Sequence, residues 1–430
     1  MKNRDVNVAE GLLRFIEQSP SAYHVVENIK NMLLEMGFQE LKEVDAWIVK
    51  PSKGYFVIRN GSSVIAFRMP AKTPKGFHIV ASHSDSPTFK VKENAEMYVE
   101  EQYIKLNTEK YGGMILSTWL DRPLSVAGRI VVRGADGQPM VKLVNVDKDL
   151  LVIPNVAIHM NRDMNKGVEY NPQTDMLPLM ALGTKEDGVQ LLLTEAAEAA
   201  GVNVADILGH DLFLYVREKG RLLGAKQEFV LSPKLDDLQC VYTSLQAFAE
   251  TKPKKYVNVL AVFDNEEVGS GTAQGADSTL LQDVLMRIGE TLDYNHGEYC
   301  RMIAESYLVS ADNAHAVHPN HPEKADPTNR PYIGGGIVIK YHGSQRYTTD
   351  AVSTAQMKLL CERAKVPYQT YTNRSDIVGG GTLGNISTAH VSLSSVDIGL
   401  PQLAMHSAVE TAGVQDTVYA VKVFTALYGE

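Results

Sequence analysis

The chain has 430 residues, 44% hydrophobic and 22% charged, a composition typical of a globular protein large enough for two or three domains. No apolar run is long enough to span a bilayer, and the first residues are typical of an amphipathic helix rather than a secretion signal, so we expect a cytoplasmic protein without membrane contact. The net charge of -9 and the lack of a Lys/Arg stripe interleaved with aromatic residues argue against a nucleic-acid partner.

The first part of the chain predicts helices followed by strands. Apolar residues recur at helical spacing over 7–37, which predicts two helices, the second ending at Gly37. From about 55 to 82 the pattern is strand-like, with YFVIRN and SVIAFRM on either side of Asn60-Gly61, a strong hairpin signal.

The middle of the chain differs in texture from both ends. Between about 95 and 230 short strands alternate with turn residues, which predicts a β-rich domain. After it, helices and fully apolar strands alternate, as expected for a sheet covered on both faces. We therefore predict an α/β fold with a mixed sheet flanked by helices, formed by residues 1–94 and 231–430 and interrupted by a β-rich insertion at 95–230.

Four apolar runs end in side chains that can bind metal. In chain order, these ends carry His83 and Asp85, Glu266 and Glu267, Asp312, and His406. The turn before a helix in SPKLDDLQC adds Asp236. Ligands of open α/β sheets bind outside the carboxyl ends of the strands, so these ends are expected to converge. A lone histidine at a strand end is more often structural, but this combined set of nitrogen and oxygen donors without cysteine suits zinc, cobalt or manganese.

The adjacent glutamates predict a division of labour. Neighbouring side chains point apart, so one can bind metal while the other faces a metal-activated water. The free glutamate can take the proton of that water and deliver it to a leaving amine. A carboxylate such as Asp85 on the second nitrogen of His83 would fix the orientation of the imidazole ring. A metal-stabilised scaffold without activity would explain the ligands but not the second glutamate.

Five motifs resemble, in order and spacing, those of the aspartyl aminopeptidase family of dinuclear zinc metallopeptidases. They are HSDSP (83–87), SPKLDDL (232–238), DNEEVGS (264–270), SADNAHAVHPN (310–320) and AMHSAVE (404–410). The resemblance extends over nearly the whole chain and implies a dinuclear zinc exopeptidase-like fold. It also implies these roles: Asp236 bridging two ions, His83 and Asp312 on one ion, Glu267 and His406 on the other, Glu266 as general base, and Asp85 as the partner of His83.

The resemblance also concerns assembly and specificity. It implies a homo-oligomer, in the family a tetrahedral dodecamer, in which His159 of VAIHMNR reaches a neighbouring active site; a buried structural histidine is the alternative. Lys340 holds the family position for the cation that recognises acidic residues, although a rim lysine reaching solvent is the other interpretation. Gly380 belongs to the loop NRSDIVGGGTLG, which departs from the eukaryotic pattern near the substrate pocket and puts strict Asp/Glu specificity in doubt.

The sequence therefore predicts a metalloaminopeptidase acting on short peptides. It would remove N-terminal residues, with Asp and Glu as the family substrates, by means of water activated between two divalent ions, zinc first and cobalt or manganese as alternatives. A broad or apolar-preferring aminopeptidase and a related metal-dependent deacylase stay open. A carboxypeptidase would need an arginine clamp, for which the sequence offers no candidate.

Overall fold

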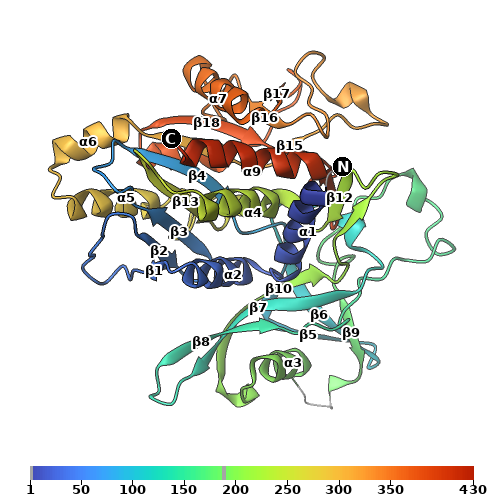
Figure 1. Ribbon diagram of the computed structural model, residues 1–430. Helices are drawn as coiled ribbons and strands as arrows, with labels where there is room; N and C mark the ends of the chain where they lie inside the picture. The colour runs from blue at the N-terminus through green and yellow to red at the C-terminus, as the bar shows by residue number, and fades with distance from the viewer. Residues whose placement is uncertain (1–2, 186–189) are drawn as a thin grey trace. The chain divides into compact units, whose positions relative to one another are not determined.

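The protein folds into two compact units in the computed structural model, which describes residues 3–185 and 190–430 (Figure 1). The first unit comprises the sequence up to residue 85 together with residues 220–405 and 410–430. The second comprises residues 86–219 and the short segment 406–409. Within the described ranges, no helix combines the length and the apolar character needed to cross a membrane.

A nine-stranded mixed sheet forms the centre of the first unit. Its order is β1 (Gln39–Glu40), β2 (Gly54–Arg59), β3 (Ser63–Arg68), β13 (Val257–Phe263), β4 (Phe77–His83), β14 (Tyr307–Ala311), β18 (Ser394–Gly399), β16 (Ile337–Lys340) and β17 (Tyr368–Tyr371). The hairpin predicted at Asn60-Gly61 joins β2 to β3, and both residues have positive φ as the turn requires. The four strands β13, β4, β14 and β18 are parallel, so their carboxyl ends lie at one edge of the sheet.

Helices cover both faces of this sheet. They are α1 (Asn3–Glu17), α2 (Ala22–Glu35), α4 (Leu235–Glu250), α5 (Leu280–Thr291), α6 (His296–Ala304), α7 (Ala351–Ala364), α8 (Leu383–His390) and α9 (Val414–Tyr428). Successive residues of a strand point to opposite faces. Accordingly, Val80 of β4 packs in one core with α1, α2, α4, α7 and α9, whereas Ile79 packs in the other with α5, α6 and α8. The predicted α/β fold with a mixed, helix-covered sheet is confirmed.

A smaller five-stranded sheet also belongs to the first unit. Its order is β11 (Arg221–Leu223), β12 (Phe229–Ser232), β20 (Glu410–Gly413), β19 (Pro401–Leu403) and β15 (Ala314–His315). Strand β15 follows shortly after β14, and β12 leads into α4. This small sheet therefore adjoins the segments that leave the carboxyl edge of the large one.

The second unit is β-rich, as the predicted fold class requires. Its sheet has the order β8 (Pro139–Asn145), β7 (Leu124–Arg133), β10 (Ile207–Val216), β5 (Thr88–Val99), β6 (Tyr103–Tyr111) and β9 (Leu179–Leu182), with antiparallel neighbours throughout. Helix α3 (Leu191–Ala200) packs on this sheet, and its Leu192 joins a core that includes Trp119 and Leu212.

Candidate metal centre

The carboxyl edge of the large sheet gathers the predicted ligands of the first unit. His83 is the last residue of β4, and Asp312 directly follows β14. Glu266 and Glu267 begin a short 3-10 helix just beyond β13. Asp236 lies at the start of α4, where non-helical φ and ψ angles at residues 236 and 237 break the first turn. The predicted convergence of these strand ends therefore occurs in the folded protein.

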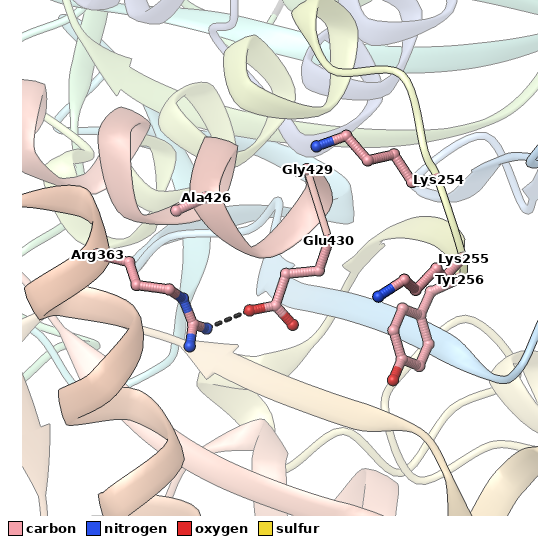
Figure 2. Close-up of a pocket in the computed structure, with 7 residues that line it drawn as sticks. All are labelled: Lys254, Lys255, Tyr256, Arg363, Ala426, Gly429 and Glu430. Atoms are coloured by element: carbon pink, nitrogen blue, oxygen red, sulfur yellow. Dashed lines mark hydrogen bonds and ion pairs between the residues drawn. The ribbon is translucent and has the colours of Figure 1, made fainter.

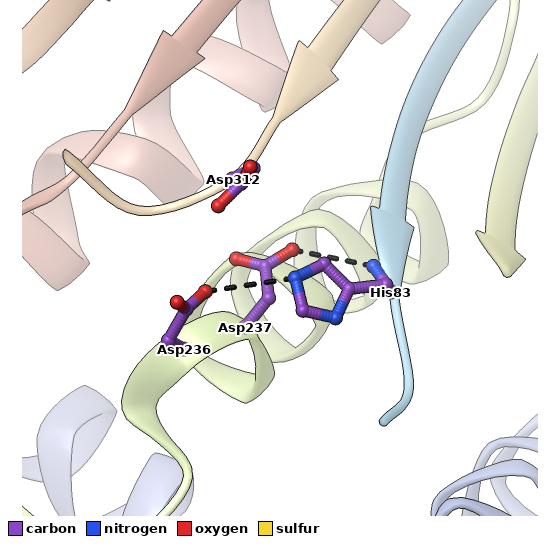
Figure 3. A group of neighbouring side chains, drawn as sticks. All are labelled: His83, Asp236, Asp237 and Asp312. Atoms are coloured by element: carbon purple, nitrogen blue, oxygen red, sulfur yellow. Dashed lines mark hydrogen bonds and ion pairs between the residues drawn. The ribbon is translucent and has the colours of Figure 1, made fainter. Parts of the chain in front are cut away.

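Within the first unit, two overlapping groups of described side chains are close enough to share a metal ion. One ligand atom from each of His83, Asp236, Asp237 and Asp312 lies within 4.8 Å of the others (Figure 3). The same holds for His83, Glu266 and Glu267. Nε2 of His83 lies 3.5 Å from Oδ1 of Asp236, and the backbone N–H of His83 donates to Oδ2 of Asp237 at 3.2 Å. His83 is thus common to both groups.

Asp85 connects the histidine to the adjacent glutamates. Its Oδ1 lies 3.3 Å from Nδ1 of His83, the nitrogen opposite the one facing Asp236. Its two carboxylate oxygens also accept hydrogen bonds from the backbone N–H groups of Glu266, at 3.2 Å, and Glu267, at 3.1 Å. Asp85 therefore orients the imidazole ring and the loop that carries both glutamates.

The cluster carries more negative charge than its own cations can balance. Burial, together with the neighbouring carboxylates, raises the pKa of Asp312 to about 6 and that of Glu266 to about 8, and raises the pKa of Glu267 and Asp237 well above the usual range. Burial lowers the pKa of His83, but hydrogen bonds to Asp236 and Asp85 outweigh it and hold that pKa well above its ordinary value. Such a site favours bound protons or bound cations.

The donor set fits a divalent ion such as zinc. It consists of imidazole nitrogen and carboxylate oxygen without thiolate, which suits zinc, manganese or cobalt. Oδ1 of Asp237 is buried and has no hydrogen-bond partner among the described residues. Asp237 is not among the predicted site residues, and its place beside Asp236 in the acidic pair of SPKLDDL is the signal that could have pointed to it.

Lys340 is buried beside this cluster. It is 2% exposed, and its ammonium group donates to the backbone oxygen atoms of Asp312 at 2.7 Å and Asn313 at 3.3 Å. Nζ also lies 3.6 Å from Oδ2 of Asp312. The alternative of a rim lysine that reaches solvent is therefore wrong.

His159 and Gly380 belong to none of the groups of described side chains that could hold a metal ion. His159 is exposed in a turn of the second unit, so the alternative of a buried structural histidine is wrong. His406 also belongs to the second unit, where Nδ1 hydrogen bonds to the backbone oxygen of Gly113. Gly380 is exposed in the loop that precedes α8. The proposed roles of these three residues stay predictions.

A separate cavity of about 480 Å³ in the first unit has a different lining (Figure 2). Its residues are Lys254, Lys255, Tyr256, Arg363, Ala426, Gly429 and Glu430. Arg363 pairs with the carboxylate of Glu430. None of these residues belongs to a group of described side chains that could hold a metal ion, so this cavity is separate from the candidate metal centre.

This combination of fold and site defines a metal-dependent hydrolase of the α/β class. Residues 15–428 match the family model described as aminopeptidase I zinc metalloprotease (M18), and the protein belongs to this family. It is 48% identical over 432 residues to the probable M18 family aminopeptidase 2 of Clostridium novyi (strain NT), covering 100% of both chains. The prediction of a metalloaminopeptidase, a hydrolase, is confirmed.

Solved structures show the same fold. A chain in the cryo-EM structure of the Ape4 and Nbr1 complex is 36% identical, with a TM-score of 0.96 over 99% of this chain and 86% of that chain. A chain of the S. cerevisiae mApe1 dodecamer is 26% identical, with a TM-score of 0.87 over 99% of this chain and 97% of that chain.

Proposed function

We propose that this protein removes N-terminal residues from short peptides, using two divalent ions held at the carboxyl edge of the large sheet, with zinc as the resident metal. The observation that carries the proposal is the pair of overlapping donor groups that share His83, one of which contains both adjacent glutamates. Following the family resemblance, Asp236 would be a ligand shared by both ions. His83 and Asp312 would hold one ion, and the resemblance assigns Glu267 and His406 to the other.

Bound divalent ions would polarise the scissile carbonyl and make the attacking water more acidic. Glu266 is the general base that takes the proton of this water and returns it to the leaving amine. A carboxylate that both accepts and delivers a proton needs a pKa near the working pH. In the metal-free protein burial raises the pKa of Glu266 to about 8, and bound cations would lower it from there. Asp85 holds the Glu266 backbone in place through the hydrogen bond at 3.2 Å.

Two preferences for the N-terminal residue of the peptide substrate are open. Family resemblance favours Asp or Glu, with Lys340 as the recognising cation and Gly380 in the loop that contacts substrate. The contacts of Lys340 favour a broad or apolar preference instead, because its ammonium group already binds two backbone oxygens and faces the Asp312 carboxylate. A substrate carboxylate would have to share that ammonium with a proposed metal ligand.

We also propose that the protein is a homo-oligomer, specifically a dodecamer, in which His159 acts on a neighbouring subunit as a donor to the developing oxyanion. Support comes from the dodecamer formed by the mApe1 relative. A second support is the exposed apolar set around His159, in which Val156 is 52%, Ile158 47% and Met160 82% exposed. A cytoplasmic location stays a prediction.

The decisive test is Glu266→Gln, compared with Glu290→Gln at an exposed glutamate. Both variants and wild type are loaded with zinc and assayed on aminoacyl chromogenic substrates with acidic, apolar and basic side chains, plus one N-acetylated control. Glu266→Gln should keep its zinc and lose roughly 10²–10⁴-fold in kcat, the usual contribution of a general acid-base group. Equal activity of this variant and wild type would sink the mechanism. Cleavage of the acetylated substrate alone would indicate a deacylase.

A further inference from the structure

Three buried side chains connect the segments that carry the proposed ligands Asp236 and Asp312 to the five-stranded sheet. Asn313 directly follows Asp312, Gln402 lies on β19 and Glu410 begins β20. They are 3%, 1% and 2% exposed, respectively. We call these three residues the Asn-Gln-Glu ring, because their hydrogen bonds close a ring through one peptide group.

That peptide group joins Leu235 to Asp236 at the start of α4. Nδ2 of Asn313 donates to the Leu235 backbone oxygen at 3.0 Å and to Oε1 of Gln402 at 2.9 Å. Nε2 of Gln402 lies 3.4 Å from Oε1 of Glu410, and the backbone N–H of Asp236 donates to Oε2 of Glu410 at 3.0 Å. Both sides of the peptide that carries Asp236 are thereby held.

The polarity of this ring is fixed by the peptide. A backbone carbonyl oxygen can only accept a hydrogen bond, and a backbone N–H can only donate one. Asn313 must therefore turn its amide donors toward Leu235 and Gln402. Gln402 must accept from Asn313 and donate onward. Residue 410 then receives a donor on each side, so it needs two acceptors, which a glutamate supplies and a glutamine does not.

We propose that Glu410 is a positioning residue that, through the Asn-Gln-Glu ring, sets the separation of the Asp236 and Asp312 carboxylates and thereby the metal affinity. Glu410 and Asn313 hold the two sides of the peptide between Leu235 and Asp236. Asn313 is also the residue that directly follows Asp312. The inference rests on the proposed ligation of metal by these two aspartates. Glu410 itself acts through the ring and touches neither substrate nor metal.

The polarity argument predicts a specific rescue. Glu410→Gln places an amide donor against the Gln402 donor, and loss of such an outer partner typically weakens metal binding roughly 10–100-fold. In the double variant E410Q/Q402E the carboxylate moves to position 402, where it can accept both from Asn313 and from the new amide at position 410. The amide oxygen at position 410 then accepts from the backbone N–H of Asp236. The double variant has the composition and net charge of wild type.

The experiment measures zinc affinity by competition with a chromogenic chelator on metal-stripped full-length protein, together with the melting temperature. Asp416→Asn is the matched control, because the Asp416 carboxylate also accepts two backbone N–H groups, those of Gly334 at 2.7 Å and Gly336 at 2.9 Å, in a part of the unit without proposed ligands. We expect Asp416→Asn to lower the melting temperature without changing zinc affinity. Glu410→Gln should weaken zinc binding, and E410Q/Q402E should recover most of it.

Each outcome decides the inference. Unchanged zinc affinity in Glu410→Gln, or a double variant that binds no better than the single one, overturns it. If Glu410→Gln does not fold, a folded double variant with near wild-type affinity supports the ring, and a double variant that also fails to fold overturns it. Wild type that binds no zinc would overturn the proposed metal centre as well, which distinguishes the two failures.

Discussion

The half-buried Asp211 of the second unit and the buried carboxylates of the first unit have pKa values shifted in opposite directions. In the second unit, Asp211 on β10 accepts from Nε of Arg129 at 2.9 Å and pairs with Nζ of Lys90 at 3.2 Å. Burial raises the pKa of Asp211, but these two cations outweigh it and leave the pKa below its usual value. In the first unit, burial and neighbouring carboxylates raise the pKa of Asp312 to about 6 and of Glu266 to about 8.

The difference separates structural charge from functional charge. A carboxylate with its own arginine contributes to the fold without any further ligand. A group of carboxylates that outnumbers its cations is costly to keep ionised and is stable only when protons or metal ions neutralise it. The carboxyl edge of the large sheet therefore has an excess of carboxylates that a metal ion can neutralise. The following predictions test this contrast between the carboxylates of the two units.

The largest effect is expected for Asp236→Asn. The amide keeps the size of the side chain but removes the charge that faces Nε2 of His83, 3.5 Å away. We expect loss of at least one zinc ion, and a fall in activity greater than the roughly 10–100-fold typical for an outer partner. Zinc content by elemental analysis and kcat on an aminoacyl substrate check this. Asp293→Asn, at an exposed aspartate, is the control, and full zinc content in Asp236→Asn would remove it from the ligand set.

Removal of metal should make stability strongly dependent on pH. A carboxyl group with a raised folded-state pKa binds more protons folded than unfolded between its two pKa values, so the free energy of unfolding falls as pH rises. The metal-free protein should therefore lose stability from about pH 4 to pH 8, the latter set by Glu266. The loss should be on the order of several kcal/mol, since one pKa unit is about 1.4 kcal/mol.

Urea unfolding of chelator-treated protein at several pH values measures this slope, and zinc-loaded protein near pH 8 is the reference. Zinc should restore stability at the pH where the metal-free protein is weakest, because cations then neutralise the carboxylates in place of protons. A metal-free protein that is as stable at about pH 8 as at about pH 5 would show that the cluster stores no charge imbalance.

The sequence predicted this site where the signal was local. Apolar runs that end in His83, Glu266 and Asp312 are readable along the chain, and parallel strands necessarily bring their carboxyl ends to one edge. The Asn-Gln-Glu ring was not predictable in this way. It joins Asp236 to Glu410, 174 positions later, through strands of the five-stranded sheet too short to give a periodic pattern.

Lys340 shows a second limit of sequence reasoning. An unpaired lysine in an apolar strand is costly, but the sequence does not indicate which anion pairs with it. The partner is Asp312 at the end of β14, a strand that is separated from β16 by β18 in the sheet order.

The predicted domain boundaries at 94/95 and 230/231 stay a prediction. Contacts within the protein divide it instead after residues 85 and 219.

An intermediate effect is expected for Asp85→Asn. The asparagine side chain presents one amide donor where the carboxylate accepted from the backbone N–H groups of Glu266 and Glu267. The imidazole ring of His83 should therefore lose its fixed orientation, and so should the loop that carries both glutamates. We expect roughly 10–100-fold weaker zinc binding. Chelator competition measures it, and wild-type affinity in the variant would show that other contacts position the loop.

The smallest effect should come from the second unit. Asp211→Asn removes a partly exposed ion pair, which we expect to cost about 1 kcal/mol or less in the free energy of unfolding. Because the pKa of Asp211 is lowered, the contribution of this carboxylate to the free energy of unfolding is present above the ordinary pKa and is lost as pH falls through the folded-state pKa. The metal-free cluster has the opposite pH dependence. Zinc affinity should equal that of wild type. A large loss of zinc in this variant would mean that the charge balance of the second unit also supports the metal centre, and the contrast between the two kinds of carboxylate would then fail.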